Sequence, residues 1–154
     1  MNFIEIFYKD EKYDVVSKAR LKDIKTAGYN ASFIFKTEHI YKIDGDLSEQ
    51  ELFKIADELL VDPIIQKFQV NTKDTDERYN GFYIADVWLK KGVTDTVGET
   101  IEKSIKTLGI NVETRVCTGF RYLMDGKLDG KLLDEMVKKL LMNGVIQESN
   151  TRKI

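Results

Sequence analysis

The sequence repeats itself once, and this repeat restricts the possible folds more than any other feature. Shifting the chain of 154 residues by 81 positions, without a gap, places Tyr41 on Tyr122. About 19 of 73 paired positions are identical, whereas unrelated sequences of ordinary composition would share roughly 4 or 5. We interpret the chain as a tandem duplication, with repeats at 1–73 and 82–154 and a polar linker at about 71–81.

Both repeats have the same predicted order of elements. Alternating apolar residues predict the strands, and helical spacing with flanking turn residues predicts the helices. In the first repeat, strands are expected at 3–9, 31–36, 39–43 and 64–70, and helices at 14–27 and 48–59. In the second, strands are expected at 82–89, 111–116, 120–124 and 145–151, and helices at 96–108 and 130–142. The expected fold class is α+β, with two βαββαβ units.

A βαββαβ unit places two helices on one face of a four-stranded antiparallel sheet and leaves the other face to be covered. An uncovered face would expose apolar strand residues such as Ile4, Ile84 and Trp88. We therefore expect the two halves to pack against each other with pseudo-two-fold symmetry.

Composition excludes several classes of function. With 24 basic and 26 acidic side chains, the chain lacks the positive excess that binds a phosphate backbone, so nucleic acid is not an expected partner. Cys117 is the only cysteine, which excludes an internal disulfide and a thiolate metal cluster. No apolar run is long enough to cross a bilayer. We expect a cytoplasmic protein that does not insert into membranes.

Three kinds of segment resemble the PurS family. Residues 87–102 resemble its opening, in which a strand leads into an Asp-x-x-Gly-x-Thr-Ile-Glu helix start. Residues 59–65 and 140–146 resemble its Leu-Leu-x-Asn-Pro-Val-Ile-Glu ending. Residues 118–123 resemble a Thr-Gly-x-Arg-Tyr strand in the N-terminal domain of long, single-chain phosphoribosylformylglycinamidine (FGAM) synthases.

The resemblance implies a ferredoxin-like fold and a non-catalytic role in purine biosynthesis. PurS proteins are small dimers without an active site, and they bridge the ATP-dependent synthetase PurL and the glutaminase PurQ for ammonia transfer. The resemblance therefore implies no cofactor in this chain, with ATP and Mg²⁺ on the partner synthetase. The chain looks like a fused PurS dimer. Whether it is a separate subunit or the first domain of a longer synthase, and whether it self-associates, stays open.

The two obvious candidates for acid-base or nucleophilic chemistry are His39 and Cys117. Under the repeat they correspond to Phe120 and Lys36, so neither is a duplicated function. Both lie where strand residues are expected. We assign them structural roles, because the chain supplies no obvious partners for a catalytic triad.

Asp44-Gly45 and Asp125-Gly126 recur in the two halves and could be mistaken for metal or phosphate ligands. An Asp-Gly pair also suits a tight turn, in which glycine takes a positive φ angle. Ser48 and Asp129, which follow these pairs, are well placed as helix N-caps. We interpret both pairs as turns.

The loop with Lys90, Lys91 and Gly92 precedes a predicted helix, a setting in which anions bind. It lacks the Walker spacing, which argues against a nucleotide loop. Two interpretations stay open: a contact with the synthetase, or an ordinary loop before a helix capped by Asp95 or Thr96.

Arg121, Tyr122 and Tyr41 lie in the third predicted strand of their repeats. Arginine and tyrosine are enriched at interface hot spots. For the two tyrosines a cross-strand core pair is the alternative. Arg121 is the stronger interface candidate.

A competing function is a small-molecule regulatory domain of the ACT type, which also pairs βαββαβ units and binds amino acids between them. Fold alone does not separate the two functions. The PurS-like segments favour the first, since they occur at both ends of the repeat, whereas a glycine-rich ligand loop occurs in only one copy.

Overall fold

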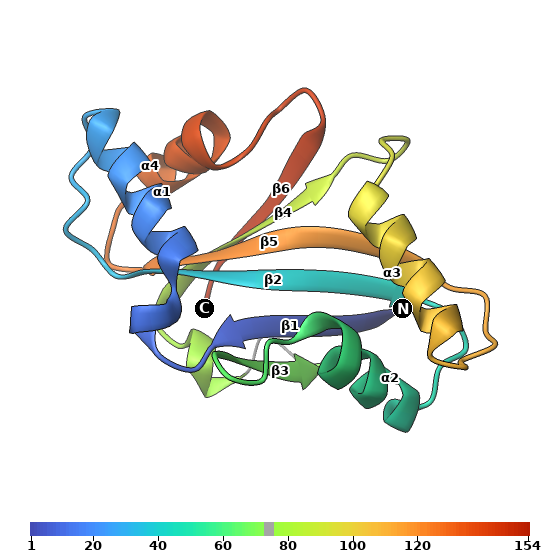
Figure 1. The fold of residues 1–154 in the computed structure, drawn as a ribbon. Coiled ribbons are helices and arrows are strands. Elements are labelled where there is room, and N and C mark those ends of the chain that lie inside the picture. The colour runs from blue at the N-terminus through green and yellow to red at the C-terminus, as the bar shows by residue number, and fades with distance from the viewer. Residues whose placement is uncertain (73–75) are drawn as a thin grey trace.

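Six strands form one antiparallel sheet in the order β3-β1-β2-β5-β4-β6, and four α-helices cover one of its faces (Figure 1). The computed structural model describes residues 1–72 and 76–154. The strands are β1 (Asn2–Tyr8), β2 (Phe35–Asp44), β3 (Gln66–Val70), β4 (Phe82–Leu89), β5 (Arg115–Asp125) and β6 (Gln147–Lys153). The helices are α1 (Val15–Thr26), α2 (Glu49–Ile55), α3 (Thr96–Thr107) and α4 (Gly130–Met136). The helical turns are η1 (Glu11–Tyr13), η2 (Ala56–Leu60), η3 (Glu77–Tyr79) and η4 (Val137–Leu141).

The α+β class and the placement of the helices on one face are confirmed, but the βαββαβ order is wrong. The two short strands expected at 31–36 and 39–43 are replaced by the single strand β2, and the corresponding pair in the second half by β5. The residues between the two expected strands continue the ladder, because Glu38 pairs with Arg121. Each half is therefore a βαβαβ unit with three strands.

The halves join edge to edge, which corrects the expectation that one half would cover the open sheet face of the other. β2 and β5 pair along their length and form the centre of the sheet. The strand order is symmetric about this ladder, since β1, β2 and β3 occupy the same positions in their half as β4, β5 and β6 in theirs. His39 pairs with Phe120, its counterpart under the 81-residue offset. A pseudo-two-fold arrangement therefore exists, but within one sheet.

Two hydrophobic clusters lie between the helices and the sheet, and each contains residues from both halves. One cluster joins Ile4 and Ile55 to Ile105 of α3. The other joins Ile24 of α1 to Val87 of β4. In Figure 1, α1 lies beside α4 at one end of the sheet and α3 beside α2 at the other. Each half therefore needs the other to bury its own helices.

The helices begin where the sequence predicts capping side chains. Ser48 accepts a hydrogen bond from the backbone N–H of Glu51 at 3.1 Å, and Asp129 accepts one from Lys131. Asp95 caps α3 and also accepts the backbone N–H of Thr118 in β5 at 2.6 Å. These bonds satisfy donors at the helix starts that have no partner within the helix.

The glycine at the start of α3 permits close packing of that helix on β5. A Cβ atom on Gly98 would collide with the carbonyl oxygen of Val116. The first half has Ser17 at the corresponding position, and its hydroxyl contacts Asp14 at 2.6 Å and Thr37 at 2.8 Å. The two halves therefore use one topology with different helix-to-strand contacts.

Residues 73–75 of the predicted linker lie outside the described residues. The segment that follows is part of the packed structure. It forms the turn η3, whose Tyr79 is 0% exposed and packs with Ile84 and Leu123. This segment covers part of the sheet face opposite the helices.

Candidate functional site

The sheet face opposite the helices contains a cluster of buried charges. Glu5, Glu38, Asp86 and Arg121 come from the four inner strands and are each less than 7% exposed. Strand pairing places them next to one another, with Glu38 opposite Arg121 and Arg121 opposite Asp86. Alternation along the strands directs these side chains away from the helices. We call these four residues, with Arg78 and Tyr79, the ion cluster.

Arg121 is the central cation of the ion cluster. Its Nε donates to Asp86 Oδ1 at 2.7 Å and its Nη2 to Asp86 Oδ2 at 2.9 Å, which is a bidentate pair. Its Nη1 donates to Glu5 Oε1 at 3.2 Å and to the Tyr79 hydroxyl at 2.9 Å. Asp86 also pairs with Arg152 of the edge strand β6 at 3.1 Å. Two carboxylates and a hydroxyl therefore hold this guanidinium, a strong charge-assisted arrangement.

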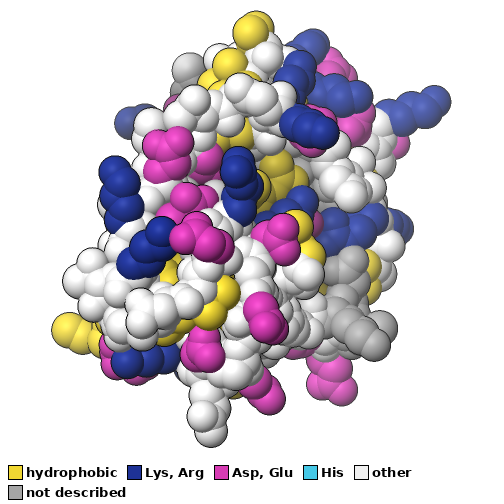
Figure 2. All heavy atoms as spheres, turned by 90° about the vertical axis from the view of Figure 1, so that its right-hand side faces the viewer, with side chains coloured by type: hydrophobic (Ala, Val, Ile, Leu, Met, Phe, Trp, Pro, Cys, Tyr) yellow, Lys and Arg dark blue, Asp and Glu magenta, His cyan; other side chains and the backbone are white. Residues whose placement is uncertain are grey.

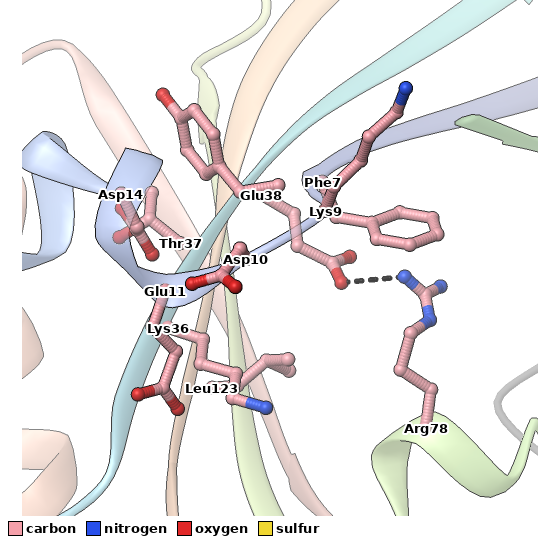
Figure 3. Close-up of a pocket in the computed structure, with 11 residues that line it drawn as sticks. Phe7, Lys9, Asp10, Glu11, Asp14, Lys36, Thr37, Glu38, Arg78 and Leu123 are labelled. Atoms are coloured by element: carbon pink, nitrogen blue, oxygen red, sulfur yellow. Dashed lines mark hydrogen bonds and ion pairs between the residues drawn. The ribbon is translucent and has the colours of Figure 1, made fainter. Parts of the chain in front are cut away.

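The segment between the halves supplies the second cation. Arg78 reaches from η3 toward Glu38 (Figure 3), and its Nη1 lies 2.8 Å from Glu38 Oε1. Its Nη2 lies 2.8 Å from Glu5 Oε2. The hydroxyl of Tyr79 contacts both carboxylates, at 2.9 and 3.1 Å. The ion cluster thus ties the segment between the halves to strands β1 and β2.

Burial shifts the protonation of the acidic members. Loss of solvation raises the pKa of Glu38 to about 7, although the charge of Arg78 opposes the shift. Burial also raises the pKa of Glu5, against the opposing charge of Arg121. For the Tyr79 hydroxyl, burial and the neighbouring Glu38 charge raise the pKa as well. The cluster therefore takes up a proton more readily than exposed carboxylates would.

Glu38 should make the stability of the fold depend on pH. A carboxyl group with a raised pKa in the folded state stabilises the fold most below the pKa of the unfolded chain, and this contribution disappears as the pH rises through about 7. We expect the free energy of unfolding to fall by about 2 kcal/mol between pH 5 and pH 8, relative to a Glu38→Gln variant. Urea unfolding of both proteins at each pH measures this difference. The same pH dependence in both proteins would contradict the assignment.

The structure places the predicted interface residues of the central strands mostly inside the protein. Arg121 is 3% exposed and belongs to the ion cluster. Tyr122 is 1% exposed and stacks on Phe35 with ring centroids 5.7 Å apart. Tyr41 is half-buried and packs against the cluster that contains Ile4. These side chains have structural contacts within the chain.

The predicted loop residues lie at the surface. Lys90, Lys91 and Gly92 are exposed, and they line a cavity of about 440 Å³ between this loop and β5. The Lys90 ammonium donates to the carbonyl oxygen of Gly144 at 2.7 Å. Gly92 has a φ of +90°, a conformation that favours glycine. The structure does not bring this loop and the ion cluster together into one site.

His39 and Cys117 lie in strands, as predicted. The imidazole of His39 lies against the ring of Phe120, with centroids 5.0 Å apart, and burial lowers its pKa. Cys117 is exposed and has a free thiol. The described part of the chain contains no group of three His, Cys, Asp or Glu side chains arranged to hold a metal ion.

The two Asp-Gly pairs lie at the ends of β2 and β5, in agreement with the predicted turns. Gly45 has a positive φ, whereas Gly126 does not. A Cβ atom on Gly126 would instead lie 2.5 Å from the carbonyl oxygen of Gly81. Close approach of two backbones therefore explains the second glycine.

A cavity of about 480 Å³ opens beside the ion cluster (Figure 3). Phe7 and Leu123 form part of its apolar wall, and Glu38 and Arg78 form part of its polar wall. The Glu38 carboxylate is already bound by Arg78 and the Tyr79 hydroxyl. The cavity therefore does not present Glu38 as a free base.

The end of the molecule that carries α3 has a mixed surface. Figure 2 shows Lys and Arg side chains interspersed with Asp and Glu, and hydrophobic side chains in small separate groups. A nucleic-acid-binding face usually gathers positive charge into a patch or stripe. None of the described helices is both long and apolar enough to cross a bilayer.

Sequence reasoning missed most of the ion cluster. Glu5 and Asp86 correspond under the 81-residue offset, but they differ in side chain and so do not count as an identity. An acidic residue at the same position of two apolar strands was the available signal. For Arg78, the polar surroundings indicated a linker, and the local sequence gives no sign of burial.

A comparison with known protein families finds a match in the second half of the chain. Residues 84–153, from within β4 to the end of β6, match the PurS family, described as phosphoribosylformylglycinamidine (FGAM) synthase. No curated protein sequence matches this chain. The resemblance deduced from the sequence is thereby confirmed for this half. The second half of the chain is therefore similar to the PurS family, which belongs to the FGAM synthase of purine biosynthesis.

Proposed function

We propose that this chain is a non-catalytic component of FGAM synthase. In this proposal it bridges the ATP-dependent synthetase (PurL) and the glutaminase (PurQ), and it holds them so that ammonia passes directly between their sites. ATP and Mg²⁺ belong to the synthetase. Residues 1–73 and 82–154 are two copies of one repeat, and together they take the place of a PurS dimer.

The family match of residues 84–153 is the observation that carries this proposal. The architecture supports it, because the first half has the same order of strands and helices and completes a symmetric sheet. Two similar halves in one rigid sheet give a bridging protein two comparable surfaces at a fixed separation. Such a scaffold acts through proximity, by holding two reacting centres in register.

Reconstitution tests the proposed bridging role. The matching synthetase and glutaminase are assayed for amidine formation with and without this chain, using glutamine or ammonium as the nitrogen source. We expect the chain to be required for most of the glutamine-dependent rate. The ammonium-dependent rate should change little, since free ammonia needs no transfer between subunits.

The ammonium reaction is the control for an intact synthetase. Full coupling of glutamine hydrolysis to amidine formation without this chain would overturn the bridging role. Titration calorimetry of the isolated chain with glutamine addresses the ACT-type alternative, for which micromolar binding is expected.

A further inference from the structure

Two exposed aliphatic residues occupy equivalent loops at the starts of the edge strands. Ile64 is 77% exposed and Val145 is 81% exposed, and they correspond under the 81-residue offset. A single exposed aliphatic residue is ordinary in a soluble protein. Here the same feature occurs at the same position of both halves. We call residues 62–66 and 143–147 the two tips.

The tips have matching hydrogen bonds. The N–H groups of Ile64 and Val145 donate to the side chains of Asp62 and Asn143, each at 3.0 Å. The side-chain oxygens of Gln66 and Gln147 accept hydrogen bonds from the backbone N–H groups of Asp62 and Asn143, at 2.9 and 2.7 Å. Lys9 and Lys90 reach the carbonyl oxygens of Pro63 and Gly144.

These bonds order the backbone before any partner arrives. Binding through a preorganised loop avoids much of the entropy cost of fixing a flexible one. The exposed aliphatic side chains contribute little to the core of this chain, whereas burial in a partner would gain hydrophobic free energy. The tips therefore have the properties of contact points.

Topology places the tips far apart. They begin β3 and β6, which are the two edges of the sheet. Five strand spacings separate these edges, which is about 24 Å. The strands β1 and β4 that lead toward the tips run in opposite directions (Figure 1), so the tips lie at opposite ends as well. One small pocket on a partner cannot receive both.

The surroundings of the tips differ in charge. The segment 49–66, from α2 to the first tip, contains five carboxylates and one lysine. The corresponding segment 130–147 contains three lysines and two carboxylates. The exposed pair Asp57 and Glu58 corresponds to the exposed pair Lys138 and Lys139, which form ion pairs with Asp134 and Glu135 at 2.9 and 2.6 Å. Equivalent loops thus present an aliphatic side chain beside a strongly acidic platform in the first half and a nearly neutral, slightly basic one in the second.

We propose that the two tips dock two different protein partners. Ile64 enters an apolar socket with a basic rim, and Val145 enters an apolar socket with an acidic or neutral rim. This inference rests on the proposed function, in which the partners are the synthetase and the glutaminase. Charge complementarity then decides which partner each half accepts, since a platform of the wrong sign opposes docking.

Binding of purified full-length variants to each partner tests the division. Ile64→Ser should weaken binding to one partner by about 10-fold in Kd and leave the other unchanged, and Val145→Ser should do the converse. The matched control is Val15→Ser, which alters an aliphatic residue that is 65% exposed at the start of α1. It should leave both affinities unchanged.

A charge exchange tests the platform. The double variant Asp57→Lys, Glu58→Lys gives the first half the two lysines that the second half has at the equivalent positions. It should lower the affinity only for the partner whose binding Ile64→Ser weakens. This loss of affinity should become smaller at higher salt concentration, because salt screens the interaction.

The outcomes separate this inference from the proposed function. If the unaltered chain binds both partners and all tip variants bind them with the same affinities, the tips are not docking sites. The bridging role would still stand. If both serine variants lose affinity for the same partner, the two halves do not dock different partners. Failure of the unaltered chain to bind either partner would overturn both proposals.

Discussion

Replacing Arg121 with methionine is expected to lower the free energy of unfolding by about 3–5 kcal/mol. The guanidinium is 3% exposed and holds Asp86 and Glu5. Methionine fills a similar volume, so the loss comes from the carboxylates that remain buried without this cation. Urea unfolding at neutral pH measures the change. For a chain of this size it corresponds to a fall in Tm of about 10 °C.

The control is Arg115→Met, on the same strand but exposed, which should change stability by less than about 0.5 kcal/mol. Adding Asp86→Asn to Arg121→Met removes one of the carboxylates that lost this cation and should recover part of the loss. The deficit should also shrink at pH 5, where protonation of Glu5 becomes easier because its pKa is already raised. A deficit that is independent of pH and of Asp86 would show that packing, and not charge, makes Arg121 important.

Local signals predicted the first strand and the helix starts of each half well. The strand expected at 82–89 is β4, and the predicted caps Ser48, Asp95 and Asp129 begin their helices. These features depend on neighbours within a few residues, such as alternation along a strand or an acceptor for the first N–H groups of a helix. A sequence contains that information directly.

The joining of the two halves depends on contacts distant in sequence, and it was not predicted. The segment around Glu38 resembles a break between two short strands when it is considered alone. It continues as one strand because β5 supplies hydrogen-bond partners along its whole length. Edge-to-edge pairing also leaves one sheet face without a second layer of helices, so the buried charges and η3 occupy it.

The ion cluster was hidden for a related reason. A charged residue in an apolar strand, such as Glu5, is expected to point to solvent. The alternation of side chains along β1 does place it on the sheet face away from the helices. It is buried because Arg78 and Tyr79 return over that face. The predicted role of Arg121 at an interface came from its residue type, which does not distinguish a partner in another protein from one in the same chain.

Replacing Tyr79 with alanine is expected to lower the free energy of unfolding by about 3–5 kcal/mol. The ring is fully buried against Ile84 and Leu123, and the hydroxyl contacts Glu5 and Glu38. The variant loses the buried ring and leaves a cavity. It also removes the hydroxyl that the two buried carboxylates share as a hydrogen-bond donor, which adds to the cost.

Tyr79→Phe separates these contributions, because it keeps the ring and removes only the hydroxyl. We expect a loss of about 1–3 kcal/mol for phenylalanine, smaller than for alanine, and both can be measured by urea unfolding. A chain that tolerated alanine without loss would have a segment between its halves that acts only as a tether. The expected loss instead makes this segment part of the core. The two halves are then connected through the chain, through the β2–β5 ladder and through the ring and hydroxyl of Tyr79. We therefore expect them to unfold together.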